Sequence, residues 1–152
     1  MDEVRLADRL AIRALVDRYA QGAAGRRPDQ VAAQFTLDGV LTICTDPDGV
    51  VVRAERRGRE QIAEAMTGLA RYRVTTHHVG QQLLDFDADD VHVAHGETYC
   101  EAHHWRERVG VTVDRVMSIR YQDRYARIDG TWLIAHRLLL TDWTEDREVR
   151  LA

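Results

Sequence analysis

Two adjacent histidines, His77 and His78, stand in the segment TTHHVG and are the first candidates for chemistry. A neutral imidazole can accept a proton near neutral pH, and it can also ligate a metal. The surrounding residues predict a β-strand, in which successive side chains point to opposite faces. One histidine therefore points into the protein and is a candidate general base, unless it is only a core residue. Alternation by itself does not say which of the two it is.

A second group of polar candidates lies in the segment HVAHGETYCEAHHW. Alternation puts five residues on each face of this strand: His95, Glu97, Tyr99, Glu101 and His103 on one, and Gly96, Thr98, Cys100, Ala102 and His104 on the other. Small side chains suit a concave lining, so we expect the face with Gly96 to point inward. The histidines have no compact metal-ligand spacing, and no metal site is predicted.

An arginine, Arg137, interrupts the apolar segment WLIAHRLLL. We expect it to face inward together with neighbours at alternate positions, namely Leu133, Ala135, Leu139 and Thr141. A buried guanidinium must pair with an acid or with a ligand anion. The pattern leaves open whether Arg137 anchors a substrate or forms a structural ion pair with Asp38 or Asp123.

Composition limits the class of protein. The 152 residues fit one domain, 1–152, with 45% hydrophobic and 30% charged residues. A net charge of −4 argues against nucleic acid as a main partner. No apolar run approaches a membrane span, and the acidic, amphipathic N-terminus is unlike a secretory signal. Two cysteines without CxxC spacing favour a reduced, cytoplasmic protein. Nucleotide-binding and hydrolase motifs are absent from the sequence.

The elements that must hold these residues follow from periodicity and turn signals. A helix is predicted over residues 4–23, because mostly apolar residues recur there at three- and four-residue steps and so share one face. They are Val4, Asp8, Ala11, Ile12, Leu15, Tyr19 and Ala23. A short helix at 28–35, a hairpin of strands 38–43 and 50–53, and a helix at 58–70 follow. Four strands are then predicted at 74–87, 91–105, 114–128 and 131–143. This order predicts an α+β fold in which a curved antiparallel sheet wraps on the helices.

Five segments together resemble a known family: LADRLAIRALVDRYAQG, QFTLDGVL, GREQI, TTHHVGQQLLDFD and DRYARIDGTWLIAHR. In order and spacing they are similar to the SnoaL-like branch of the nuclear-transport-factor-2-like superfamily, over roughly residues 6–141. The resemblance implies a cone-shaped α+β barrel: a strongly curved mixed sheet, capped by three N-terminal helices, around a deep pocket. The superfamily includes scytalone dehydratase, bile-acid dehydratase, hexachlorocyclohexane dehydrochlorinase and polyketide cyclases, and also non-catalytic binding proteins, so the fold alone does not decide function.

The resemblance also assigns residues. A T-x-H pattern near the start of the third strand selects His77 as the inward histidine, and Arg137 matches an arginine five residues after the tryptophan Trp132. Tyr19 matches a polar residue of the first helix that faces the pocket. The family's aspartate, which pairs with the histidine, is replaced here by Ala24. If the protein is catalytic, another acid must approach His77, and we expect Asp38 to do so.

The resemblance thus implies a small, cofactor-free dehydratase, isomerase or cyclase acting on an aromatic, polycyclic or polyketide-like carbonyl compound. His77 would remove a proton, and Arg137 and Tyr19 would hold the developing enolate oxygen. The expected pocket lining is apolar and small polar: Leu15, Thr98, Cys100, His104, Met117, Tyr121 and Leu139. The alternative is a ligand-binding or accessory subunit of the same fold. Aromatic residues on the outer sheet face, Tyr99 and Trp105, predict a homo-dimer or homo-trimer.

Overall fold

The computed structural model describes residues 3–150 and the side chains of residues 5–150. Two helices, α1 (Glu3–Ala24) and α2 (Pro28–Ala32), precede a hairpin formed by β1 (Phe35–Cys44) and β2 (Val52–Arg57). The helix α3 (Gly58–Met66) follows the hairpin and continues into the 3-10 helix η1 (Thr67–Arg71). Four long strands follow, β3 (Val74–Phe86), β4 (Val93–Arg108), β5 (Val111–Ile128) and β6 (Thr131–Glu148). The predicted order of elements is therefore correct.

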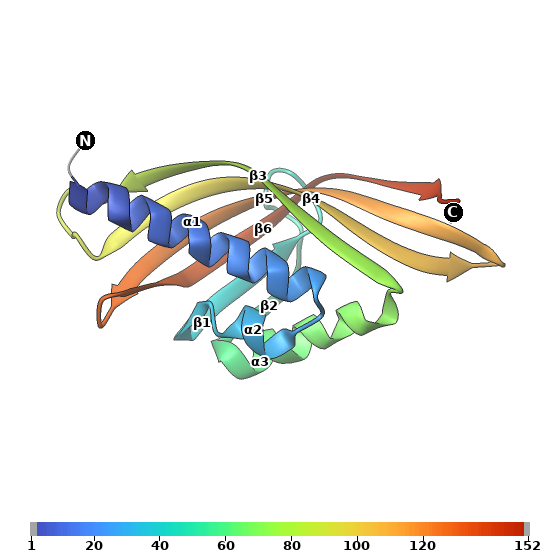
Figure 1. Ribbon diagram of the computed structural model, residues 1–152, viewed down its shortest axis with the longest axis horizontal. Coiled ribbons are helices and arrows are strands. Elements are labelled where there is room, and N and C mark those ends of the chain that lie inside the picture. Colours follow the sequence, from blue (N-terminus) through green and yellow to red (C-terminus); the bar gives the residue numbers. More distant parts are fainter. Residues whose placement is uncertain (1–2, 151–152) are drawn as a thin grey trace.

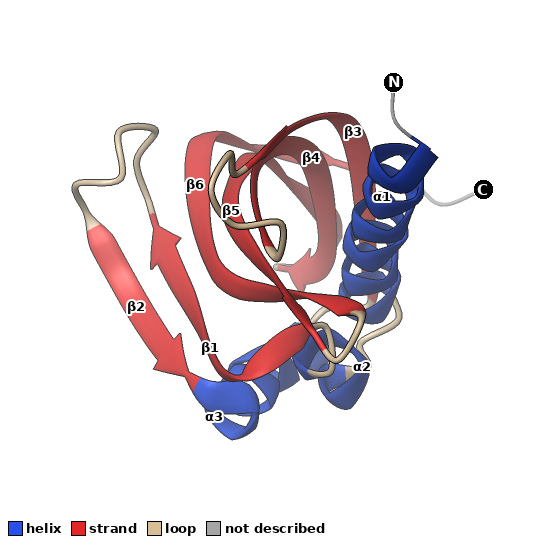
Figure 2. Cartoon of the chain, turned by 90° about the vertical axis from the view of Figure 1, so that its left-hand side faces the viewer, coloured by secondary structure: helices blue, strands red, loops and turns tan. Residues whose placement is uncertain are grey.

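The six strands form one mixed, unclosed sheet in the order β2-β1-β6-β5-β4-β3. All neighbours are antiparallel except β1 and β6, which are parallel, so the sheet is not purely antiparallel as the strand pattern had suggested. The long strands β3 to β6 are strongly bent, and the helices lie on the concave side (Figure 1). In the view of Figure 2, α1 covers one side of the space enclosed by the bent strands, and α2 and α3 cover its base.

The helix α1 holds the sheet through one apolar face. Ile12, Leu15, Tyr19 and Ala23 are almost fully buried in the core cluster, as the periodicity predicted, and Val16, which was not predicted, is buried with them. Ala11 was expected on this face but is exposed, and the side chain of Val4 lies outside the described residues. Asp8 is also buried, because its carboxylate accepts a 2.8 Å hydrogen bond from Trp132 Nε1 of β6. Such a bond satisfies an acid that is otherwise costly to bury.

Several element boundaries differ from the sequence prediction. The helix α2 ends at Ala32, and β1 begins already at Phe35, because the backbone of Gln34 and Ile134 pairs there. The second strand of the hairpin is Val52–Arg57 instead of 50–53, since Asp46 accepts hydrogen bonds from the backbone N–H groups of Val50 and Val51 and keeps them in the turn. Among the described residues, no helix has both the length and the apolar character needed to cross a membrane.

A β-bulge in β6 reverses part of the predicted facing. Tyr125 pairs with Ile134 but Arg124 pairs with His136, so Ala135 is an extra residue. A bulge of this kind shifts the alternation by one position. Ile134 therefore shares the buried face with Arg137, whereas Leu133 and Ala135 do not, which corrects the sequence expectation for these two residues.

Candidate active site

A cavity of about 280 Å³ lies between the concave face of the sheet and the helices. Residues from all six strands line it, together with residues from α1, α3 and η1. Its lining is largely apolar and includes Ile43, Met66, Leu69, Met117, Ile119 and Leu139. Among the described residues, its lining has no aspartate or glutamate. An enclosed apolar space with a few polar groups is the usual form of a small-molecule site.

His77 is placed on this cavity by the first residues of β3. Thr75 Oγ1 donates a 2.7 Å hydrogen bond to the carbonyl of Ala24 at the end of α1, and Arg26 Nη1 donates one of 2.7 Å to the carbonyl of Tyr72. These bonds fix the start of β3 against the end of α1. With that register His77 lines the cavity, and His78 is exposed on the opposite face.

Burial makes His77 a neutral imidazole. The pKa of His77 is lowered from the ordinary 6.5 to about 3, mainly by burial and in smaller part by the nearby His104 and His103. Its Nδ1 is buried and has no hydrogen-bond partner among the described residues. Ala24 supplies only its backbone carbonyl, and that accepts from Thr75.

The substitute acid proposed from the sequence does not reach His77. Asp38 is exposed, and its carboxylate accepts a 3.0 Å hydrogen bond from Thr36 Oγ1. The strand β1 begins earlier than predicted, at Phe35, and its register against β6 shifts between Phe35 and Val40, where Leu37 and Asp38 are both exposed. The expected pairing of Asp38 with His77 is therefore wrong.

A second buried histidine, His104, faces His77. The two ring centroids are 5.5 Å apart and the rings are almost perpendicular, at 87°. His104 also packs on Tyr72, at 4.8 Å between centroids. Burial lowers the pKa of His104, and its Nδ1, like that of His77, is buried without a hydrogen-bond partner. Two neutral imidazoles thus share one wall of the cavity.

A buried ion pair lies behind Tyr19 and Tyr121, two residues that line the cavity. Arg137 is fully buried, and its Nε and Nη2 donate to the two carboxylate oxygens of Asp123 at 2.8 and 2.7 Å. Tyr125 donates a further 2.7 Å bond to Asp123. The rings of Tyr19 and Tyr121 both pack against the guanidinium, each centroid 4.0 Å from Cζ, and they contact each other edge to face with centroids 5.6 Å apart. Of the two acids considered for Arg137, Asp123 is the partner.

This arrangement keeps the two tyrosines protonated beside a cation. Burial raises the pKa of Tyr19 and raises that of Tyr121 well above its ordinary value, although Arg137 opposes both shifts. Both phenols are therefore hydrogen-bond donors at neutral pH. The Tyr121 hydroxyl and Arg137 Nη1 are buried and have no hydrogen-bond partner in the described part of the chain.

The remaining residues predicted for ligand contact divide into two groups. His104, Met117, Tyr121 and Leu139 line the cavity, as do Tyr19 and His77. Leu15, Thr98 and Cys100 are buried in the core but are not among the lining residues. Alternation along β4 correctly separated the buried face from the exposed one. It does not say which buried residues line the cavity and which lie in the core, because that depends on the helix that covers each position.

Four cavity residues with polar side chains were not predicted from the sequence. Tyr72, Arg53, Arg56 and Arg71 all line it. The signal available in the sequence was the density of arginine between Arg53 and Arg73, which by itself does not say which side chains meet. Their convergence depends on a strand bulge and on the short helix η1, neither of which periodicity reveals.

The convex face of the sheet has a wider and more open groove of about 640 Å³, lined by residues such as His95, Glu97, Arg124 and His136. Its lining is mixed in charge, and it lies on the opposite face from His77. In the described residues, no group of three or more histidine, cysteine, aspartate or glutamate side chains is arranged to hold a metal ion. The enclosed cavity is therefore the better candidate site.

The low pKa of His77 predicts acid sensitivity of the fold. Below about pH 6.5 the unfolded chain takes up a proton at His77 that the folded protein does not, so stability should fall from pH 6.5 towards pH 3. At pH 5 the loss from this residue should be about 2 kcal/mol. His104, whose pKa is also lowered, adds to it.

Urea unfolding at pH 7.5 and pH 5.0 measures this effect. We expect His77→Gln to lose less stability on acidification than the unmodified protein, and His78→Gln, which changes an exposed residue, to lose as much. An unchanged acid loss in His77→Gln would contradict the assignment.

Comparison with known proteins agrees with this geometry. A family model described as the SnoaL-like domain matches residues 4–138, which is most of the chain. The chain belongs to the SnoaL-like family. No curated protein sequence matches it significantly.

Solved structures with the same fold cover nearly all of this SnoaL-like chain. One, provisionally named a scytalone dehydratase, from Novosphingobium aromaticivorans, is 26% identical with a TM-score of 0.79 and covers 100% of this chain and 95% of its own. A protein of unknown function from Mycobacterium tuberculosis is 28% identical with a TM-score of 0.75, covering 92% and 75%. A hexachlorocyclohexane dehydrochlorinase, LinA type 2, is 17% identical with a TM-score of 0.81, covering 100% and 97%, and at that identity the likeness concerns the fold.

Proposed function

We propose that this SnoaL-like protein is a small lyase or isomerase that acts on an apolar carbonyl compound of the aromatic, polycyclic or polyketide-like type. The observation that carries the proposal is the position of His77 on the wall of an apolar cavity: a half-buried, neutral imidazole whose Nδ1 is buried and has no acid partner among the described residues. A neutral imidazole can accept a proton, and an apolar site supports the removal of a proton from carbon by excluding water. Membership of the family and the likeness to the protein named as a scytalone dehydratase support the reaction class.

In the proposed reaction His77 removes a proton from the carbon next to the carbonyl. The electron pair of that C–H bond forms a carbon–carbon double bond, and the carbonyl pair moves to oxygen as an enolate. Tyr19, a protonated phenol on the cavity wall, donates a hydrogen bond to this oxygen. In an elimination, protonated His77 returns its proton to a hydroxyl group, which leaves as water. In an isomerisation, His77 returns the proton to a second carbon. In a cyclisation, the enolate carbon forms a bond to a carbonyl carbon, and the oxygen of that carbonyl takes the proton from His77.

Arg137 has a positioning role in this scheme. It is fully buried, and its bonds to Asp123 already use Nε and Nη2. Its charge lies 4.0 Å from the Tyr19 ring centroid and so favours negative charge on an oxygen bound by Tyr19. We therefore place Arg137 behind Tyr19, as the group that orients it and supports the enolate electrostatically.

A second function is favoured by one feature of the same site. The family's acid is replaced by Ala24, and the described residues supply no carboxylate to the His77 ring, so the protonated form of His77 would have little stabilisation. The alternative is a protein that binds the same class of ligand without turning it over, or an accessory subunit. We propose a homo-dimer or homo-trimer in either case. Of the two aromatic residues on which this was predicted, Tyr99 is exposed and Trp105 is half-buried, and Trp143 is a further exposed aromatic residue of the sheet.

Deuterium exchange separates the two functions. The protein would be incubated in D₂O with a panel of hydroxy-ketones and polyketide-like ketones, and deuterium at the carbon next to the carbonyl would be followed by NMR. We expect exchange above the buffer rate for the ketones that bind, whichever step follows the enolate. Binding without exchange or turnover would favour the ligand-binding alternative.

A further inference from the structure

Three arginines converge on the cavity that contains His77. Arg53 and Arg56 come from β2, and Arg71 is the last residue of η1. Arg53 and Arg71 are exposed and Arg56 is half-buried, so the three lie towards the opening of the cavity, whereas Tyr19 and Tyr121 lie at its buried floor. We call Arg53, Arg56 and Arg71 the arginine rim.

None of these arginines is neutralised by the protein. Among residues 5–150, no carboxylate lies within 4.0 Å of their guanidinium nitrogens. Arg56 donates only to the backbone carbonyl of Glu55, and Arg71 donates a 2.8 Å bond to the Tyr72 hydroxyl while lying over its ring. Most other arginines of the sheet behave differently: Arg57, next in sequence, pairs with Glu55 at 2.7 Å.

The absence of acids is a property of the whole lining. Glu64 shares a neighbouring groove with Arg56 without forming an ion pair with it, and the cavity itself is lined by neither aspartate nor glutamate in the described chain. The charge of Arg71 also extends into the cavity, since it is one of the causes, after burial, that lower the pKa of His104. The opening therefore has a positive potential that the protein does not cancel, in a chain whose net charge is −4.

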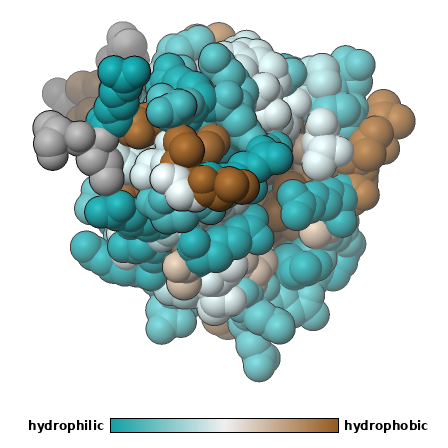
Figure 3. All heavy atoms as spheres, turned by 90° about the vertical axis from the view of Figure 1, so that its right-hand side faces the viewer, coloured by the Kyte–Doolittle hydropathy of each residue, from teal (hydrophilic) through white to brown (hydrophobic). Residues whose placement is uncertain are grey.

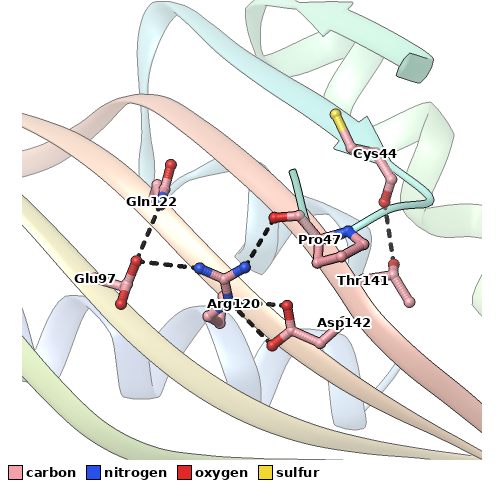
Figure 4. Close-up of polar contacts among 7 residues, drawn as sticks. All are labelled: Cys44, Pro47, Glu97, Arg120, Gln122, Thr141 and Asp142. Atoms are coloured by element: carbon pink, nitrogen blue, oxygen red, sulfur yellow. Dashed lines mark hydrogen bonds and ion pairs between the residues drawn. The ribbon is translucent and has the colours of Figure 1, made fainter. Parts of the chain in front are cut away.

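The hairpin that carries two of the arginines is held firmly in place. Arg120 of β5 donates a 2.8 Å bond to the carbonyl of Pro47 in the hairpin turn while bonding Asp142 at 2.9 Å, and Thr141 donates to the carbonyl of Cys44 (Figure 4). On β2 the register shifts, because Ile43 pairs with Ala54 but Cys44 pairs with Val52. Arg53 is the extra residue of this bulge, which lets it reach the same cavity as Ala54 and Arg56.

The surface at one end of the molecule is otherwise ordinary. Viewed from the end where the β4–β5 hairpin protrudes in Figure 1, most side chains are hydrophilic, and hydrophobic ones gather in small groups (Figure 3). On this face the described residues form no broad apolar patch (Figure 3). The distinguishing feature is a small apolar cavity with uncompensated cations at its opening.

We infer that the ligand of this cavity carries an anionic group, a carboxylate or a phosphate, that the arginine rim binds while the apolar body of the ligand lies between Met117, Leu139 and the histidines. This inference rests on the proposed function for the site and adds the charge of the substrate. Guanidinium groups suit both anions, because their N–H donors match pairs of anion oxygens. The cavity volume of about 280 Å³ accommodates a body of one to three fused rings beneath such a group.

Binding of matched acids and amides tests the inference without any need for turnover. Dissociation constants would be measured by calorimetry for benzoic, 2-naphthoic and 9-anthroic acids, for their neutral amides, and for 2-naphthyl phosphate. We expect at least one acid of the series to bind about tenfold or more tightly than its amide in 20 mM salt. The preference should shrink at 300 mM salt, since Arg53 and Arg71 are exposed. The relative affinities of 2-naphthoate and 2-naphthyl phosphate then identify the preferred anion.

Arginine variants decide whether the rim is responsible. Arg53→Gln, Arg56→Gln and Arg71→Gln should each reduce the preference for acid over amide several-fold, and the triple variant should abolish it. Arg57→Gln is the matched control, because it removes the same charge from the same strand at a residue that pairs with Glu55 and does not line the cavity.

The outcomes keep the two proposals apart. Equal binding of every acid and its amide, or an unchanged preference in the triple variant, would overturn the arginine rim even if neutral ketones exchange deuterium. A preference for acids that depends on the rim would uphold it even if no ketone exchanges, and in that case only the catalytic proposal would fall.

Discussion

His77→Gln should lower kcat by about 10²–10⁴-fold, the usual contribution of a general base. Glutamine fills similar space on the cavity wall and can still form hydrogen bonds, but its amide does not accept a proton from carbon at neutral pH. Deuterium exchange into a ketone substrate should fall by the same factor, because it reports the same proton removal. Thermal melts at pH 7.5 should show that the variant is folded.

Two further variants make this result specific. His78→Gln, on the exposed face of the same strand, should change kcat by much less. His104→Gln tests the other neutral imidazole, 5.5 Å away across the cavity. The acid limb of kcat/KM in the unmodified protein should lie well below pH 6.5, since the pKa of His77 is about 3. Equal losses in His77→Gln and His78→Gln would show that the base lies elsewhere.

Asp123→Asn should destabilise the protein by about 3–5 kcal/mol, because it leaves the Arg137 charge buried without a counter-charge. Arg137 is fully buried and packs against the rings of Tyr19 and Tyr121. The measurement is the free energy of unfolding in urea at pH 7.5.

The chain offers a matched control for this prediction. Asp142 binds Arg120 with two similar hydrogen bonds, of 2.9 and 3.0 Å, on a partly exposed part of the sheet. Asp142→Asn should cost at most about 1 kcal/mol, as is usual for ion pairs that water can screen. The double variant Asp123→Leu with Arg137→Met should recover much of the loss, since an apolar pair of similar size leaves no buried charge. Similar costs for Asp123→Asn and Asp142→Asn would contradict a special role for burial.

Tyr19 and Tyr121 contact Arg137 of the buried ion pair and also line the cavity, so the stability of the fold and the geometry of the site are linked through these two residues. Both rings line the cavity and both cover the guanidinium of Arg137. Arg137 does not line the cavity, but its contacts hold the Tyr19 and Tyr121 rings in position and so affect the geometry of the cavity. Arg137 variants therefore need the urea measurement before any loss of activity is interpreted.

Local sequence patterns determined much of this protein. Alternation along β4 separated Gly96, Thr98, Cys100, Ala102 and His104 from the exposed face, because side chains in a regular strand alternate whatever lies around them. Helical periodicity identified the buried face of α1 for a similar reason. The order of helices and strands, with the resemblance of five segments, was enough to predict the family and the fold.

Only the tertiary structure decided the rest. A one-residue bulge at Ala135 turned Leu133 away from Arg137, and the bulge at Arg53 brought an arginine to the cavity. Register shifts of this kind depend on the neighbouring strand, so the sequence of one strand does not predict them. The choice of Asp123 over Asp38 for Arg137, the exposure of Asp38, and the meeting of the arginine rim all depend on contacts between residues far apart in the chain. Local periodicity reports which face a residue occupies, whereas the partner it meets there depends on how β1, β2 and η1 pack against the long strands.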